Sequence, residues 1–205
     1  MNTNKVPVVK ARSTVEIEYK AMAFLKLTYP DLLKKPAPFP GAGFFDSGKI
    51  TEILNYDYGI ENLNDAEAYT DFDNKRLVLN KNVYEGLHTG CPRALFTLAH
   101  EISHIILHSN EIRYRIFNNC QLNKLNRSKI ITYRDPEWQA NAGAAALLMP
   151  WPTMLNIIKE KKLNLFEMAT KYNVSYTAAS IRMAKYDEYL SKKKPPAYFG
   201  GLTSC

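Results

Sequence analysis

The chain has 205 residues, of which 46% are hydrophobic and 23% are charged, and its formal net charge is +7. This length suits one domain with a small appendage and buries a core without added cross-links. The composition excludes disorder as a description of the whole chain. The positive charge is compatible with a nucleic-acid partner, but a solvated basic surface is its commoner cause, so we do not expect direct nucleic-acid binding.

Three cysteines (Cys91, Cys120 and Cys205) lie far apart and form no C-x-x-C pair. They indicate neither a zinc ribbon nor a disulfide framework, and they suit a reducing compartment. Residues 1–20 contain no continuous apolar run of the kind found in a secretory signal. The longest apolar stretch, 142–151, is about half the length of a membrane span. We therefore expect a cytoplasmic protein without membrane contact.

The N-terminal part predicts helices and loops. Apolar residues at helical spacing predict a helix over 13–33, interrupted by Pro30. Prolines and glycines over 36–43 indicate a loop, and 50–58 predicts a short helix. We assign 1–62 to an N-terminal segment that is partly helical and partly irregular.

The pattern then changes to that of a small sheet. Residues 66–72 and 76–80 are rich in β-prone residues and flank a turn signal at 73–74. A helix is predicted over 92–108, because Pro92 suits a first helical position, where its missing N–H leaves no hydrogen bond unmade.

The remaining elements are predicted to be mostly helical. Residues 109–134 are polar and predict irregular structure, whereas 135–149 predicts a well-marked helix, with Asp135 as its N-cap and Pro150 beyond its end. Two or three further helices are predicted over 152–190.

The residues His-Glu-Ile-Ser-His at 100–104 match H-E-x-x-H and lie in the helix predicted to begin at Pro92. Histidines four residues apart stand one turn above another, so their imidazoles can converge on one zinc ion. Zinc lowers the pKa of a bound water towards neutrality, and Glu101 can take the proton of that water as general base. Apolar residues fall on nearly the opposite face of the helix, so His100 and His104 are expected to line a cleft.

A catalytic zinc needs a third protein ligand. His108 lies about 12 Å along a continuous helix from His100, so we expect it to support the site or line the cleft rather than bind the metal. Glu111 is a second candidate, in a segment predicted to be irregular. Glu137 is the favoured candidate, because it begins a helix, and Asn141 one turn later suits hydrogen bonding to a ligand histidine.

The chain resembles the ImmA/IrrE family of metallopeptidases in HEISHIILH at 100–108 and DPEWQANAGAAALLMP at 135–150. Weaker similarity lies at 68–80 and 171–183. Two positions differ from residues that are frequent in the family. Ser103 stands where glycine is frequent, and Gly143 stands where an aromatic residue is frequent.

The resemblance implies an α+β, zincin-like fold with a small sheet, an H-E-x-x-H helix and a C-terminal helical region. It implies one zinc ion held by His100, His104 and Glu137, with Glu101 as catalytic base. The corresponding domains are a catalytic domain at 63–150, C-terminal helices at 151–190 packed on it, and a flexible tail at 191–205.

Several family members cleave a helix-turn-helix repressor, so the resemblance implies a zinc-dependent endopeptidase with a repressor as substrate. A regulatory protein that binds or senses a repressor, with little or no cleavage, stays open as an alternative. An edge strand of the small sheet is expected to align an extended peptide, and Tyr69 and Tyr114 are candidates for stabilising the oxyanion.

The C-terminal helices can be read as a helix-turn-helix over 165–183, with Arg182 projecting near the end of its second helix. That second helix opens with residues 176–179, Tyr-Thr-Ala-Ala, which are poor in base-reading side chains. We therefore expect these helices to pack on the catalytic domain or to dock a protein substrate.

Overall fold

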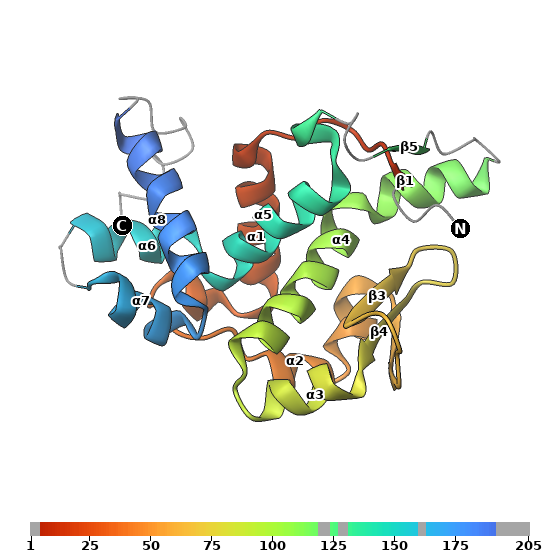
Figure 1. The fold of residues 1–205 in the computed structure, drawn as a ribbon, viewed down its shortest axis with the longest axis horizontal. Coiled ribbons are helices and arrows are strands. Elements are labelled where there is room, and N and C mark those ends of the chain that lie inside the picture. The colour runs from red at the N-terminus through yellow and green to blue at the C-terminus, as the bar shows by residue number, and fades with distance from the viewer. Residues whose placement is uncertain (1–4, 119–123, 127–130, 160–162, 192–205) are drawn as a thin grey trace.

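The computed structural model describes residues 5–118, 124–126, 131–159 and 163–191. In chain order the elements are β1 (Lys5–Pro7), α1 (Thr14–Thr28), the 3-10 helix η1 (Pro30–Leu33), α2 (Gly41–Asp46), the π-helix η2 (Ile50–Leu54), β2 (Asp57–Glu61), β3 (Ala68–Asp71), β4 (Arg76–Asn80), α3 (Lys81–His88), α4 (Pro92–Phe117), β5 (Lys124–Asn126), the 3-10 helix η4 (Thr132–Arg134), α5 (Pro136–Leu148), α6 (Trp151–Lys159), α7 (Leu165–Tyr172) and α8 (Tyr176–Ser191). Helices α4 and α5 lie in the middle, between a small sheet and the helices α6 to α8 (Figure 1). The predicted α+β class is confirmed.

The small sheet has the strand order β2-β4-β3, with β2 parallel and β3 antiparallel to the central strand. Leu77, Val78 and Leu79 of the central strand are 0% exposed. In the turn after β3, Asp71 accepts the backbone N–H groups of residues 73 and 74. The strand pair predicted around this turn is confirmed, and β3 lies at one edge of the sheet.

The helix predicted over 50–58 is only partly present. Ile50–Leu54 forms a π-helix that ends at Asn55, whose φ of 55° is left-handed, and β2 follows. Alternating apolar residues are the signal that would have indicated this strand: Tyr56, Tyr58 and Ile60.

The helix predicted over 92–108 is longer than expected, because α4 continues to Phe117. The prediction of irregular structure is therefore wrong for 109–117. The polar side chains of this stretch bond to distant backbone. Arg113 donates to a carbonyl in the turn between β3 and β4 at 2.8 Å, and Arg115 donates to one near the N-terminus at 2.9 Å.

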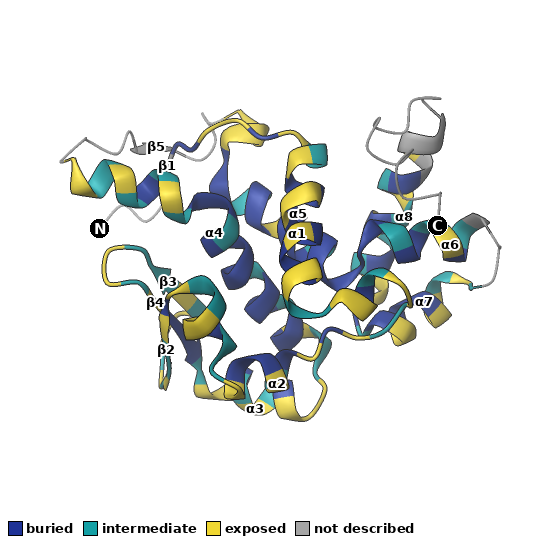
Figure 2. Ribbon diagram, turned by 180° about the vertical axis from the view of Figure 1, so that it is seen from behind, coloured by how far each residue is buried: buried dark blue, intermediate teal, exposed yellow. Residues whose placement is uncertain are grey.

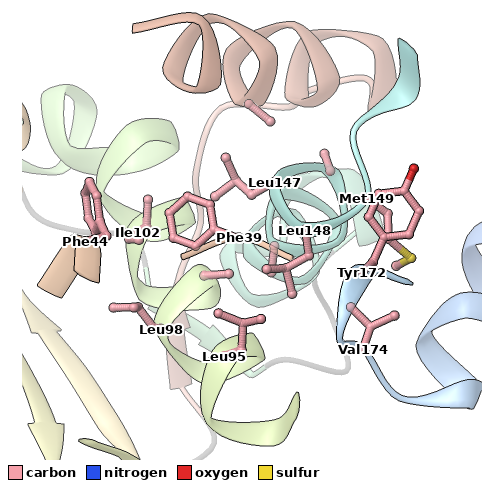
Figure 3. Packing of buried hydrophobic residues seen from close by; sticks show 14 of the residues in the cluster. Phe39, Phe44, Leu95, Leu98, Ile102, Leu147, Leu148, Met149, Tyr172 and Val174 are labelled. Atoms are coloured by element: carbon pink, nitrogen blue, oxygen red, sulfur yellow. The ribbon is translucent and has the colours of Figure 1, made fainter. Parts of the chain in front are cut away.

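The core lies between α4 and α5, and α4 is largely buried up to about residue 108, whereas its last turns are mostly exposed or half-buried (Figure 2). The apolar face of α4 meets α5 and the loop residues around α2 (Figure 3). The packed residues include Leu95, Leu98, Ile102, Leu147 and Leu148. The histidine-bearing side of α4 lies between β3 and the start of α5, where the candidate site forms.

A buried ion pair ties α8 to α1. Arg182 donates to both carboxylate oxygens of Glu18 and to the backbone carbonyl of Met149. The two charged residues are 4% and 7% exposed. In a helix-turn-helix reading Arg182 would project from the second helix, but here it turns into the protein.

The domain boundaries predicted at 62–63 and 150–151 stay predictions. Strand β2, before the first boundary, belongs to the same sheet as β3 and β4, and α1 packs on α5. Apart from Ser191, the tail predicted at 191–205 lies outside the described residues. Among the described helices, none has the length and apolar character needed to cross a lipid bilayer.

Candidate metal centre

His100, His104 and Glu137 converge on one point between α4 and α5. The Nε2 atoms of the two histidines lie 3.0 Å apart. The Glu137 carboxylate places Oε2 3.4 Å from His100 Nε2 and Oε1 3.4 Å from His104 Nε2. Two imidazole nitrogens and one carboxylate therefore lie at the corners of a triangle.

This triangle fits a zinc ion. Zinc bonds of about 2.0–2.1 Å in a tetrahedral arrangement separate two ligand atoms by roughly 3.3 Å, which is close to the separations found here. Each of the three residues offers a ligand atom within 4.8 Å of the others. Two histidines and one glutamate also form a common donor set of catalytic zinc sites, which leaves a fourth position open.

The start of α5 fixes the position of Glu137. Asp135 caps the helix by accepting the backbone N–H of Glu137 at 3.0 Å, and Pro136 occupies the first helical position. A carboxylate in the first turn is also favoured by the helix dipole. The local sequence thus places an anionic group opposite the two histidines.

The electrostatics of the centre favour a cation. Hydrogen bonds from His100 and His104 hold the pKa of Glu137 well below its usual range. Burial lowers the pKa of His100, but the hydrogen bond to Glu137 and the negative charges of Glu101 and Glu137 outweigh burial and raise it. A positive charge is therefore stabilised at this point, whether it comes from a proton or from a metal ion.

Asn141 orients His100 from one turn further along α5. Its Oδ1 lies 3.0 Å from His100 Nδ1. With that ring nitrogen donating to the amide oxygen, the lone pair of Nε2 points to the candidate metal position. This is the arrangement expected from the spacing of Glu137 and Asn141.

Glu101 is 7% exposed, and its Oε2 accepts a hydrogen bond of 2.6 Å from the Thr70 hydroxyl. Thr70 lies on the edge strand β3, and sequence analysis did not single it out. The spacing of Ala68, Thr70 and Phe72 places these residues on one face of the strand, but nothing in the sequence indicates that this face contacts Glu101.

A cavity of ≈ 310 Å³ lies beside these residues. Its lining combines β3, α4 and the start of α5: Ala68, Tyr69, Thr70, Phe72, His100, Glu101, His104, Ile112, Pro136 and Glu137. Of the two tyrosines considered for the oxyanion, Tyr69 lines this cavity. Tyr114 is not among the lining residues and is 67% exposed.

Two other expected residues lie away from the metal position. His108 is 0% exposed and lies behind His104, with 3.2 Å between the two Nδ1 atoms. Burial lowers the pKa of His108 to about 3, and the electrostatic interaction with His104 acts in the same direction. Glu111 is paired with Arg115 at 2.7 Å and with Arg12 at 3.6 Å.

The fold of the chain is similar to that of a solved structure. The structure is similar to that of a Mycobacterium tuberculosis transcriptional regulator, with a TM-score of 0.53 and 15% sequence identity, covering 80% of this chain and 45% of that chain. This likeness shows the fold, and the present chain spans less than half of that regulator. A comparison with curated protein sequences finds no match.

The sequence profile of the IrrE N-terminal-like domain, a peptidase family, matches residues 60–184. The chain therefore belongs to this family, and the resemblance seen in the motifs at 100–108 and 135–150 is confirmed. The match covers β3, β4, both central helices and most of the C-terminal helices, but only the last two residues of β2. It leaves out the segment before β2, including α1.

Proposed function

We propose that the protein is a zinc-dependent endopeptidase. The observation that carries the proposal is the convergence of His100, His104 and Glu137 at one point, with Glu101 on the same helix and in the same cavity. The edge strand β3 borders this cavity, so an extended peptide can add to the sheet with its backbone beside Glu101.

In the proposed reaction, different residues of the site have different roles in peptide hydrolysis. A zinc ion held by His100, His104 and Glu137 would polarise the scissile carbonyl and acidify a water. Glu101 is placed to take the proton of that water and to return it to the leaving amine. Thr70 holds one carboxylate oxygen of Glu101, so the other oxygen is free to face the substrate. Tyr69 lines the cavity, which supports it over Tyr114 as the donor to the oxyanion.

The proposed substrate is a helix-turn-helix repressor. Support comes from the resemblance to a family in which several members cleave such repressors, and from the regulator to which the fold is similar. The buried position of Arg182 supports a role of α7 and α8 in packing or in docking a protein, rather than in reading DNA.

The test combines metal analysis with cleavage. We expect one zinc ion per chain, and loss of cleavage of a neighbouring-gene repressor in Glu101→Gln, with the zinc content retained. Glu52→Gln changes an exposed glutamate of the π-helix and serves as the control. A Glu101→Gln variant as active as the parent would refute the assignment.

The alternative function is regulatory binding of a repressor without cleavage. The observation that favours it is the fold shared with a transcriptional regulator. A stable complex of intact repressor with the zinc-loaded protein supports this alternative, whereas defined cleavage products support the peptidase.

A further inference from the structure

Behind the metal centre, four buried side chains form one hydrogen-bonded line. His104 Nδ1 lies 3.2 Å from His108 Nδ1, and His108 Nε2 lies 3.1 Å from Gln139 Oε1. The same Gln139 oxygen accepts from Arg12 Nη1 at 2.9 Å. We call His104, His108, Gln139 and Arg12 the relay. It joins α4, α5 and the segment before α1.

The proton positions in the relay follow from its first member. With His104 Nε2 facing the metal position, Nδ1 carries the hydrogen and donates to His108 Nδ1. His108 then carries its hydrogen on Nε2 and donates to Gln139. His108 is 0% exposed, and burial favours the neutral ring. Every donor of the line thus meets an acceptor.

The amide of Gln139 is held on both sides. Its oxygen accepts from His108 and Arg12. Its nitrogen donates to the backbone carbonyls of Lys10 and Tyr133, both at 2.8 Å. Gln139 is 0% exposed, so no water competes for these bonds. The amide cannot turn without breaking four hydrogen bonds, which fixes the acceptor that His108 meets.

Residues 8–12, which we call the N-terminal strap, hold Arg12 in place. The backbone N–H groups of Val9 and Arg12 donate to η4 carbonyls at 3.3 and 3.1 Å. The Lys10 N–H donates to the Glu111 carboxylate at 2.9 and 3.0 Å. The strap lies outside the residues matched by the family profile, 60–184, so the relay ends in a part of the chain that the family signature does not include.

We propose that Gln139 and Arg12 are positioning residues for the metal ligand His104, and that the N-terminal strap thereby sets the strength of metal binding. The proposal rests on the zinc centre proposed above. Ligand histidines are commonly oriented by a carboxylate or carbonyl. Here neutral His108 accepts the hydrogen bond of the ligand histidine. The orientation of His108 depends in turn on the Gln139 amide, which Arg12 holds by a hydrogen bond.

The test measures zinc affinity of the full-length protein by competition with a chromophoric chelator. Replacing Arg12 or Gln139 by methionine keeps the side-chain length and removes the polar contacts of the relay. We expect Arg12→Met and Gln139→Met to weaken zinc binding by about 10- to 100-fold. Arg93→Met is the matched control, because Arg93 lies on the same helix as His104 but pairs with Glu67 and contacts neither the relay nor the strap.

Thermal unfolding and cobalt spectra separate positioning from a merely structural role. A structural role lowers the melting temperature equally with and without zinc, whereas positioning reduces the increase in melting temperature that zinc produces. The visible spectrum of the Co²⁺-substituted protein should change in Arg12→Met and not in Arg93→Met. Arg12→Lys keeps the charge near Glu111 and provides a milder variant, with a smaller effect in the same direction, should Arg12→Met not fold.

The outcomes distinguish the two proposals. Zinc affinity of Arg12→Met and Arg12→Lys equal to that of Arg93→Met overturns the relay and leaves the metal centre intact. A parent protein that binds no stoichiometric zinc overturns the metal centre itself.

Discussion

Ser103 on α4 and Gly143 on α5 face each other where the two central helices meet. A Cβ atom on Gly143 would lie 2.7 Å from Ser103 Oγ and 2.8 Å from Ser103 Cβ. The Ser103 hydroxyl is satisfied within its own helix, where it donates to the Ala99 carbonyl at 2.7 Å. Both positions differ from the residues that are frequent in the family, and the two differences compensate each other. The serine side chain on α4 fills the space that a side chain at position 143 of α5 would need.

We expect Gly143→Ala to lower the free energy of unfolding by about 1–2 kcal/mol. Overpacking costs about 1–3 kcal/mol, and the better helix propensity of alanine offsets up to about 1 kcal/mol of this. Gly43→Ala on α2 is the control, because nothing lies within 4 Å of its added Cβ. Urea unfolding measures both. A Gly143→Ala protein as stable as Gly43→Ala would contradict the contact, and Ser103→Gly should relieve the loss in the double variant.

Thr70→Val should slow catalysis about tenfold or more without changing the zinc content. The variant removes the hydrogen bond that holds the Glu101 carboxylate, and a bond to a charged group contributes about 1.5–3 kcal/mol. The single-turnover rate of repressor cleavage measures the effect, with the exposed Thr132→Val as control. Equal rates in both variants would show that Glu101 needs no such support.

Arg182→Met should destabilise the protein strongly, by about 3–5 kcal/mol, because it leaves the Glu18 carboxylate buried without its partner. Arg93→Met breaks the pair of Arg93 with Glu67, whose side chains are 75% and 45% exposed, and should cost less than about 1 kcal/mol. Denaturant titration compares the two. Similar losses would contradict the buried character of the α1–α8 ion pair.

Tyr172 should limit stability at alkaline pH. Burial raises the pKa of Tyr172 to about 12, although its hydroxyl donates to Thr153 at 2.9 Å. An unfolded tyrosine has a pKa of about 10, so between these values the unfolded chain loses the proton first. The stabilisation is complete below about pH 10 and is lost as the pH rises towards 12.

The Tyr172→Phe variant should therefore show a flatter stability profile over this alkaline range than the parent. The matched control is Tyr114→Phe, since Tyr114 is 67% exposed. Unfolding free energies measured in urea at a series of pH values provide the comparison. A control that flattens the profile as much as Tyr172→Phe would rule out the buried hydroxyl as the cause.

The parts of the structure that sequence predicted well are those encoded locally. Helical periodicity separated the apolar face of α4 from His100 and His104, and the capping residues before Glu137 marked the start of α5. Within one helix these signals fix which side chains share a face. The expectation that Glu137 meets the histidines came from the need of a catalytic zinc site for a third protein ligand, and the three residues do converge.

The parts that sequence missed depend on contacts between distant segments. The last turns of α4 look irregular by composition, but Arg113 and Arg115 are satisfied by backbone far away in the sequence. Thr70 and Glu101 are 31 residues apart, and Arg12 and Gln139 are 127 apart. No local pattern encodes such pairs, because each residue alone is typical of a solvent-exposed position.

The N-terminal strap also has a consequence for the order in which the protein matures. During synthesis Gln139 emerges 127 residues after Arg12. Contacts of such long sequence separation form late in folding, since their loop entropy is large. The strap can therefore make these contacts only after the last turns of α4 and the start of α5 have been synthesised. A complete zinc ligand environment then becomes a property of the fully folded chain, and a nascent or N-terminally clipped chain would hold the metal less firmly.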